Sequence, residues 1–243
     1  SELFTGNNLM IMGVLARTIT VRQMLRNWLV VYLGNFAGAV LVAALCVSGH
    51  VFSAFGGKLA ASVVAIAQTK AGLSFGDAFV RGILCNFLVC IAVWMANAAK
   101  TVGGKIAAVF FPIMAFVVAG FEHSVANMYY LAAGLFMAGQ TGAAAEGLTW
   151  GRALIGNLLP VTLGNLVGGG LLVGVSAWYL FFFLLPAELI ILLVELYLYA
   201  GCGLLTGHSK GRAAAYAITA NLASAVLGYY LAVPVWRLVV SIL

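Results

Sequence analysis

Two titratable side chains, Glu122 and His123, stand next to each other inside a long apolar run that covers residues 106–137. A titratable residue at membrane depth costs on the order of several kcal/mol and usually faces a cavity or a partner. Gly120 precedes the pair and Ser124 follows it, so we expect the helix to break here and Ser124 to cap its second half. A broken helix that carries a titratable side chain at mid-membrane is typical of a transport site.

The elements that must position this pair are apolar helices. The chain has 243 residues, of which 64% are hydrophobic and 7% are charged, whereas a soluble domain has about 25% charged residues. Apolar runs of about 20 residues recur along the chain, and they are too long for ordinary strands and lack the alternation of a barrel. The sequence therefore predicts an all-α, polytopic membrane helix bundle.

Charge and cysteine usage exclude other classes of protein. The net charge of +6 lies in loops, which indicates a topology signal rather than a nucleic-acid footprint, so we expect no nucleic-acid partner. The four cysteines, Cys46, Cys85, Cys90 and Cys202, lie in apolar runs without metal-ligand spacing. We interpret them as packing residues and expect neither a metal nor a cofactor.

The apolar runs predict the order of the elements. We expect a half-span at residues 1–17, full spans at 27–47 and 77–99, the broken span at 106–138, a long span at 152–185, and candidate spans at 186–205 and 212–232. Residues 48–76 are a mixed stretch, and residues 139–150 are a loop. The basic loops at 17–26 and 100–105 are predicted to be cytoplasmic.

Two of these spans carry the same spaced residues. Asn27, Gly34-Asn35 and Gly38 recur 130 residues later as Asn157, Gly164-Asn165 and Gly168. Each set follows a predicted half-helix, so the two halves are expected to be inverted repeats, a common plan in transporters. The alternative is chance, since small residues and asparagines are frequent where membrane helices touch.

Several ordered motifs resemble those of the formate/nitrite transporter family. They are Glu2-Leu3-Phe4-Thr5-Gly6-Asn7-Asn8, Tyr32-Leu33-Gly34-Asn35, Arg81-Gly82-Ile83-Leu84-Cys85-Asn86, Gly120-Phe121-Glu122-His123-Ser124-Val125-Ala126-Asn127-Met128 and Asn157-Leu158-Leu159-Pro160-Val161-Thr162-Leu163-Gly164-Asn165. The resemblance covers residues 1–183, and the Phe-Glu-His-Ser-Val-Ala-Asn block is this family's signature.

The resemblance implies a fold, an assembly and site residues. It implies an aquaporin-like homopentamer in the inner (plasma) membrane, each protomer passing small monovalent anions such as formate, nitrite or hydrosulfide, with protons. By resemblance, His123 is the central pore histidine and Thr5 faces it. The hydrophobic slits match Leu3, Phe4, Phe116, Val89 and Ala126, and the other polar pore positions match Lys70, Asn86, Glu122 and Asn127.

The chain departs from the family's pattern at both ends. Residues 1–184 resemble the pore region but lack the family's first span and the first half of its second. Residues 185–243 do not resemble the family and hold two further hydrophobic spans. Three interpretations are open: an N-terminal truncation, a circular permutation or a graft, and in the last two these spans fill the space of the missing helices.

The residues themselves suggest how an anion passes. The positive ends of half-helices that begin near Thr5 and His123 would favour an anion between them, and apolar burial favours a neutral imidazole. Lys70 draws the anion in, while the apolar slits oppose a full charge. A weak acid avoids this cost by taking a proton, crossing neutral and releasing the proton beyond, supported by His123 or by water that His123 orders.

Other interpretations remain open. In one of them, His123 and Glu122 form an ordinary hydrogen-bonded pair between helices. In another, Glu122 serves only to anchor the broken backbone. Lys70 is then a lysine that extends its ammonium group to the membrane interface. Phe4 and Phe116 are then core residues. An intramembrane enzyme using Glu122 and His123 is disfavoured, because the sequence has neither an H-E-x-x-H nor a G-x-S-x-G motif. A non-transporting scaffold built from a family fragment is the third alternative.

Overall fold

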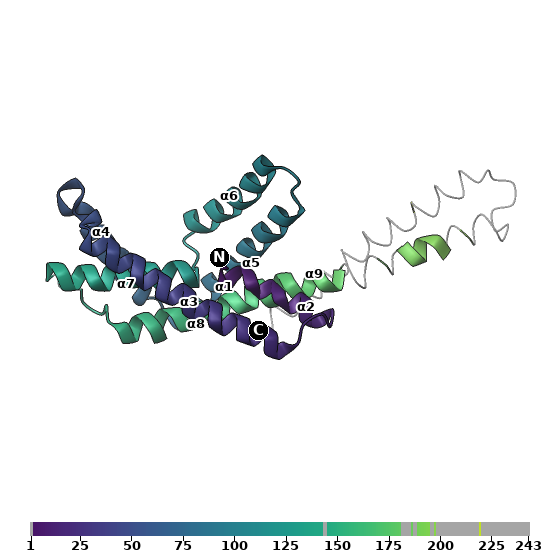
Figure 1. The fold of residues 1–243 in the computed structure, drawn as a ribbon, viewed down its shortest axis with the longest axis horizontal. Coiled ribbons are helices and arrows are strands. Elements are labelled where there is room, and N and C mark those ends of the chain that lie inside the picture. The colour runs from purple at the N-terminus through teal and green to yellow at the C-terminus, as the bar shows by residue number, and fades with distance from the viewer. Residues whose placement is uncertain are drawn as a thin grey trace. The chain divides into compact units, whose positions relative to one another are not determined.

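The structure, a computed structural model, describes residues 2–142, 145–180, 186, 189–194, 197 and 219. The chain forms two compact units, Ser1–Trp178 and Tyr179–Leu243. The described part of the first unit is helical, with no strand among these residues (Figure 1). In the second unit residues 189–194 are helical. The expectation that residues 185–243 replace missing helices concerns a stretch of which the structure describes only residues 186, 189–194, 197 and 219.

The first half of the unit is a short helical segment followed by a long helix. The short segment consists of α1 (Phe4–Asn7), η1 (Asn8–Met10) and α2 (Ile11–Leu15). The long helix α3 (Val21–Ser48) follows it. The Thr20 side chain accepts a hydrogen bond from the Gln23 backbone, and the Gln23 side chain accepts one from Thr20 N–H. This capping box starts α3 at Val21, so Arg22 and Arg26 lie on the helix and not in the predicted loop.

The stretch that the sequence presents as mixed contains a helix of its own. η2 (Val51–Ser53) and η3 (Phe55–Gly57) lead into α4 (Lys58–Ala71), and α5 (Phe75–Ala98) follows after a short turn. The Ser74 side chain accepts a hydrogen bond from Asp77 N–H and caps α5. α4 carries Lys70 in its last turn, which places that lysine on a rigid element.

The predicted break at Gly120 separates two half-helices. α6 (Val102–Val118) ends before Gly120, which has a φ of +69° that favours glycine. α7 (Ser124–Thr141) begins after the break and extends beyond the predicted end at residue 138. The expectation that Ser124 caps α7 is wrong, because His123 occupies the N-cap with extended backbone and its side chain accepts from Ala126 N–H.

A further long helix runs from Arg152 to Tyr179. It consists of η4 (Arg152–Leu158), α8 (Leu159–Asn165), η5 (Leu166–Val175) and α9 (Ser176–Tyr179), and both η4 and η5 are π-helical. With α3 and α5 it is one of three described helices long and apolar enough to cross a membrane. Phe4–Leu15 and Val102–Val118 are shorter apolar helices, as expected for half-spans.

Glycines allow α5 to pack closely on the long helix Arg152–Tyr179. α5 packs along α8 and η5, while α7 packs against both α3 and α4 (Figure 1). A Cβ at Gly164 would lie 2.2 Å from Phe79 O, and one at Gly168 would lie 2.1 Å from Ile83 O. These positions accept glycine alone, because α5 backbone occupies the space that a side chain would need.

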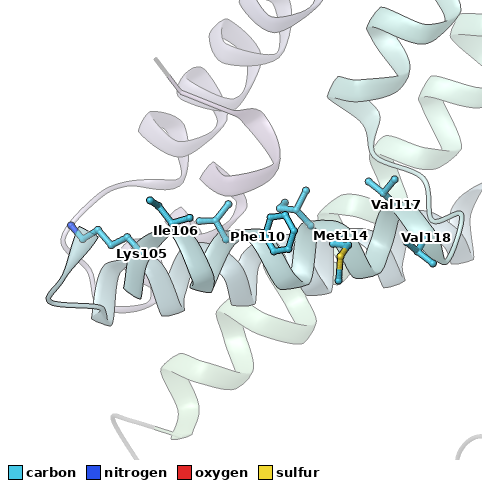
Figure 2. Close-up of a pocket in the computed structure, with 8 residues that line it drawn as sticks. Lys105, Ile106, Phe110, Met114, Val117 and Val118 are labelled. Carbon is cyan, nitrogen blue, oxygen red and sulfur yellow. The ribbon is translucent and has the colours of Figure 1, made fainter. Parts of the chain in front are cut away.

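A hollow lies along one side of α6, and its lining includes none of the buried polar residues. It has a volume of about 640 Å³ and is lined by Lys105 and by apolar side chains that Figure 2 shows along one side of the helix, among them Ile106, Phe110, Met114 and Val118. Exposed apolar surface of this kind is what a helix in a bilayer presents to lipid or to another helix.

Candidate functional site

The two broken segments meet at Thr5 and His123. Thr5 Oγ1 lies 3.0 Å from His123 Nε2, and both side chains are buried, with exposed fractions of 0% and 9%. Thr5 lies in α1, and His123 is the N-cap residue of α7. Segments that are 118 residues apart therefore contribute one polar pair at the point where both helices begin.

The cap determines which nitrogen of His123 carries the proton. Ala126 N–H donates to His123 Nδ1 over 3.1 Å, and a backbone amide can only donate. Nδ1 is therefore unprotonated, and in the neutral ring the proton lies on Nε2. Nε2–H then donates to Thr5 Oγ1, which leaves the Thr5 hydroxyl proton free to donate elsewhere.

Apolar side chains surround this pair. The Phe116 ring stacks on the His123 ring, with centroids 5.7 Å apart and planes 12° apart. Phe116 packs with Val89 and Cys85 in one buried cluster. On the other segment, the buried Phe4 contacts Tyr32 edge-on, with ring centroids 5.0 Å apart. A charged ion at the pair would have to lose its hydration to pass such walls.

Glu122 is held by an ion pair and by amides. Its Oε1 lies 2.8 Å from Lys70 Nζ, and its Oε2 accepts from Asn127 at 2.5 Å and from Asn157 at 3.4 Å. Asn157 also donates to Lys70 O. Buried charges persist where they are paired and hydrogen-bonded in this way, and both carboxylate oxygens of Glu122 have such partners beside the histidine.

Two further asparagines connect the half-helices. Asn165 Oδ1 accepts from Ser124 N–H at 2.9 Å, and Asn165 Nδ2 donates to Glu122 O at 3.1 Å and to Gly82 O at 2.8 Å. Asn86 Nδ2 donates to Asn165 O and to Thr5 O. The position of Thr5 relative to His123 therefore depends on Asn86 and Asn165.

The same bonds recur around Glu2. Asn35 Oδ1 accepts from Phe4 N–H at 2.9 Å, and Asn35 Nδ2 donates to Glu2 O at 3.0 Å. Glu2 Oε2 accepts from Asn7 at 2.7 Å and from Asn27 at 3.0 Å. Each bond matches one in the Glu122 set, so the repeated asparagines do equivalent work in both halves.

Tyr32 and Thr162 occupy corresponding positions of the two repeats. Tyr32 OH lies 3.0 Å from Thr162 Oγ1. Residues that correspond in two inverted repeats contact each other only near the axis that relates them. This hydrogen bond links α3 and α8 at positions that correspond in the two repeats.

A cavity of about 240 Å³ opens on one side of His123. Its lining includes the polar side chains Lys70, His123, Asn127 and Tyr130, together with Phe116, Phe121, Ala126, Ile66, Val117 and Gly120. The Lys70 Nζ atom lies 5.6 Å from the centroid of the Tyr130 ring. The cavity thus brings one cation, one imidazole and aromatic walls together.

The structure brings most of the predicted site residues together, with one apart. Most of them lie around the break between α6 and α7, namely Thr5, Phe116, Val89, Lys70, Asn86, Glu122, Asn127, Ala126 and His123. Phe4 lies next to Thr5 on the neighbouring segment. Leu3 is 53% exposed at the N-cap of α1. Sequence reasoning missed Asn8, Asn157, Asn165 and Tyr130 as site residues, although the asparagine repeat already contained a signal for two of them.

The family model for the formate/nitrite transporter matches residues 1–179. The chain belongs to the formate/nitrite transporter family. The resemblance seen in its motifs is thereby confirmed, and so is the all-α membrane fold. With three described helices long and apolar enough to cross a bilayer, this member of the family is a multi-pass membrane protein.

Named relatives place the chain within this family. It is 41% identical to the formate channel FocA of Haemophilus influenzae over 192 residues, which are 74% of the chain and 67% of the relative. It resembles the structure of a pentameric formate channel with formate bound, with a TM-score of 0.62 and 36% identity, over 67% of this chain and 68% of that one. It also resembles an FNT family ion channel, with a TM-score of 0.65 and 37% identity, over 74% and 69%.

The matches leave part of each protein outside the comparison. The formate/nitrite transporter match ends at residue 179, so it covers the unit that holds Thr5 and His123 and little of the second unit. The chain spans about two thirds of the length of the FocA relative.

Proposed function

We propose that this chain forms a channel for small monovalent anions of weak acids, of the class of formate, nitrite and hydrosulfide, that cross the plasma membrane together with protons. One observation carries the proposal: the Thr5–His123 pair joins the ends of two half-helices, between apolar side chains and beside a cavity that holds Lys70. Formate channels among the relatives support the class of substrate. The pentameric neighbour supports a homopentamer.

The route begins at the cavity. Lys70 attracts the anion electrostatically and its pairing with Glu122 keeps the lysine in place. Beyond Lys70, the stacked rings of Phe116 and His123 offer a carboxylate little hydration. The desolvation cost of the charged form therefore favours the neutral acid at this point.

The proton comes from water rather than from the imidazole. His123 Nδ1 is engaged by Ala126 N–H, so the neutral ring has only its Nε2 proton, and giving that up would leave an imidazolate anion. Nε2–H and the Thr5 hydroxyl instead donate hydrogen bonds to the anion and to a water that passes it a proton, and that water takes up a replacement proton from the solution on the entry side. The acid crosses neutral, one proton accompanies each anion, and the proton is released on the far side.

The test is flux of formate and of hydrosulfide into liposomes that hold the purified protein, measured with and without an inward proton gradient. We expect flux that rises with the gradient. His123→Asn removes the Nε2 donor but supplies another good N-cap side chain, and it is expected to lower flux about tenfold or more, the size of one charge-assisted hydrogen bond. His123→Phe removes both the donor and the cap.

A matched control is His50→Asn. His50 lies in the turn after α3 with a φ of 54°, a conformation that asparagine tolerates well, so this variant is expected to keep wild-type flux. Flux whose proton dependence is the same in His123→Asn and in the wild type contradicts the role of His123. Well-folded oligomers without any flux would instead favour the non-transporting scaffold.

A further inference from the structure

Tyr130 lies in the anion-receiving cavity, and no motif in the sequence draws attention to it. It is on α7, three residues after Asn127 and seven after His123, a spacing that puts all three side chains on one face of the helix. All three line the 240 Å³ cavity together with Lys70. The Tyr130 side chain is 41% exposed, so it is free to border the entrance rather than fill the core.

Lys70 has two kinds of partner around its ammonium group. Its Nζ lies 2.8 Å from Glu122 Oε1, and the face of the Tyr130 ring lies 5.6 Å away. The carboxylate offsets the charge of the lysine. The ring attracts the ammonium through its quadrupole and leaves that charge intact. The lysine stem is flexible, so the Tyr130 ring favours the conformer in which the ammonium is paired with Glu122 and also lies at the cavity.

We propose that Tyr130 is a positioning residue that holds the Lys70 ammonium at the cavity and thereby sets the affinity for the entering anion. This inference rests on the proposed function and adds to it a residue that acts through Lys70. The other cavity walls are mainly Phe116, Phe121 and Ile66, so a short monocarboxylate with its charge at Lys70 and its apolar end on the aromatic rings fits the site best.

The test is the concentration dependence of formate flux in liposomes for a set of variants. Tyr130→Leu removes the ring and is expected to raise the half-saturating formate concentration about 2- to 30-fold, the range of one cation–π contact, with little change in maximal flux. Tyr130→Phe keeps the ring and is expected to stay within about twofold of wild type. If the leucine variant does not yield folded oligomers, Tyr130→Met removes the ring and keeps more of the volume.

Two further variants separate positioning from general packing. Phe136→Leu removes another aromatic ring of α7, one that contacts Trp150 and lies outside the cavity, and should leave half-saturation unchanged. Lys70→Gln keeps a donor for Glu122 but removes the charge. In the double variant Tyr130→Leu/Lys70→Gln, half-saturation should equal that of Lys70→Gln alone, because the ring has no cation left to position.

The outcomes are distinct. If Tyr130→Leu carries formate with the same half-saturating concentration and maximal flux as the wild type, this inference is overturned and the proposed function stands. Additive effects in the double variant also overturn it, since Tyr130 would then act without Lys70. Absence of formate flux in the folded wild type overturns the proposed function and this inference together.

Discussion

Glu2 and Glu122 begin two copies of one polar framework, and their surroundings differ. Each accepts hydrogen bonds from two asparagines, and in each copy a third asparagine binds the start of the half-helix. Glu122 is 4% exposed and pairs with Lys70, whereas Glu2 is exposed and has no cation partner among the described residues. The asparagine hydrogen bonds are therefore duplicated, whereas the described ion pair lies only in the copy that contains Glu122.

The residues at the two helix starts differ as well. Leu3 is the N-cap residue of α1, and His123 is the N-cap residue of α7. A leucine side chain offers no acceptor, while the imidazole both caps its helix and reaches Thr5. The repeat thus supplies a symmetric scaffold, and substitutions within one half concentrate the titratable groups there.

The largest expected difference is between the two glutamates. Glu122→Gln keeps acceptors for the asparagines but leaves Lys70 without a counter-charge, and breaking a buried pair costs about 3 kcal/mol, toward the low end of such losses because Lys70 reaches a cavity. Glu2→Gln, in the exposed copy, is expected to leave the melting temperature of the purified protein in detergent unchanged. A similar loss in both variants would show that Glu2 also has a buried cation partner.

A second difference concerns the repeated glycines. Gly164→Ala places a Cβ 2.2 Å from Phe79 O, and since backbone cannot yield easily, we expect a loss of about 1–3 kcal/mol. Gly34 has nothing within 4 Å among the described residues. Gly34→Ala is therefore expected to be neutral or to stabilise by up to about 1 kcal/mol through helix propensity.

Thermal unfolding of both variants and the wild type in the same detergent measures this comparison. A loss at Gly34 as large as that at Gly164 would contradict it. It would show that another helix covers α3 in the assembled protein as closely as α5 covers α8.

The smallest effect is expected where the two halves meet. Tyr32→Phe and Thr162→Val each remove one partner of the hydrogen bond between corresponding residues. Such bonds between membrane helices contribute about 0.6 kcal/mol on average. A double-mutant cycle on unfolding should return a coupling of that size, and a coupling of zero would mean that this contact does not stabilise the crossing of α3 and α8.

The sequence alone determined the membrane class, the break and the repeat. Long apolar runs with few charges settle the class because the bilayer requires them, and Gly120 marks the break because glycine readily adopts backbone conformations that end a helix. The spacing of asparagines and glycines indicated two related halves before any contact was known. These are local or periodic properties, and neighbouring residues along the chain are sufficient to specify them.

Tertiary structure decided which atoms meet. His123, and not Ser124, caps α7 because the extended backbone at residue 123 directs the imidazole to Ala126 N–H. Lys70 on α4 reaches Glu122 across 52 residues. Asn165 on α8 joins η1, α5 and α7 through Asn8, Asn86 and Ser124. Such contacts depend on how the helices are aligned with one another. That alignment is set by side-chain packing between distant positions, so no single stretch of sequence specifies it.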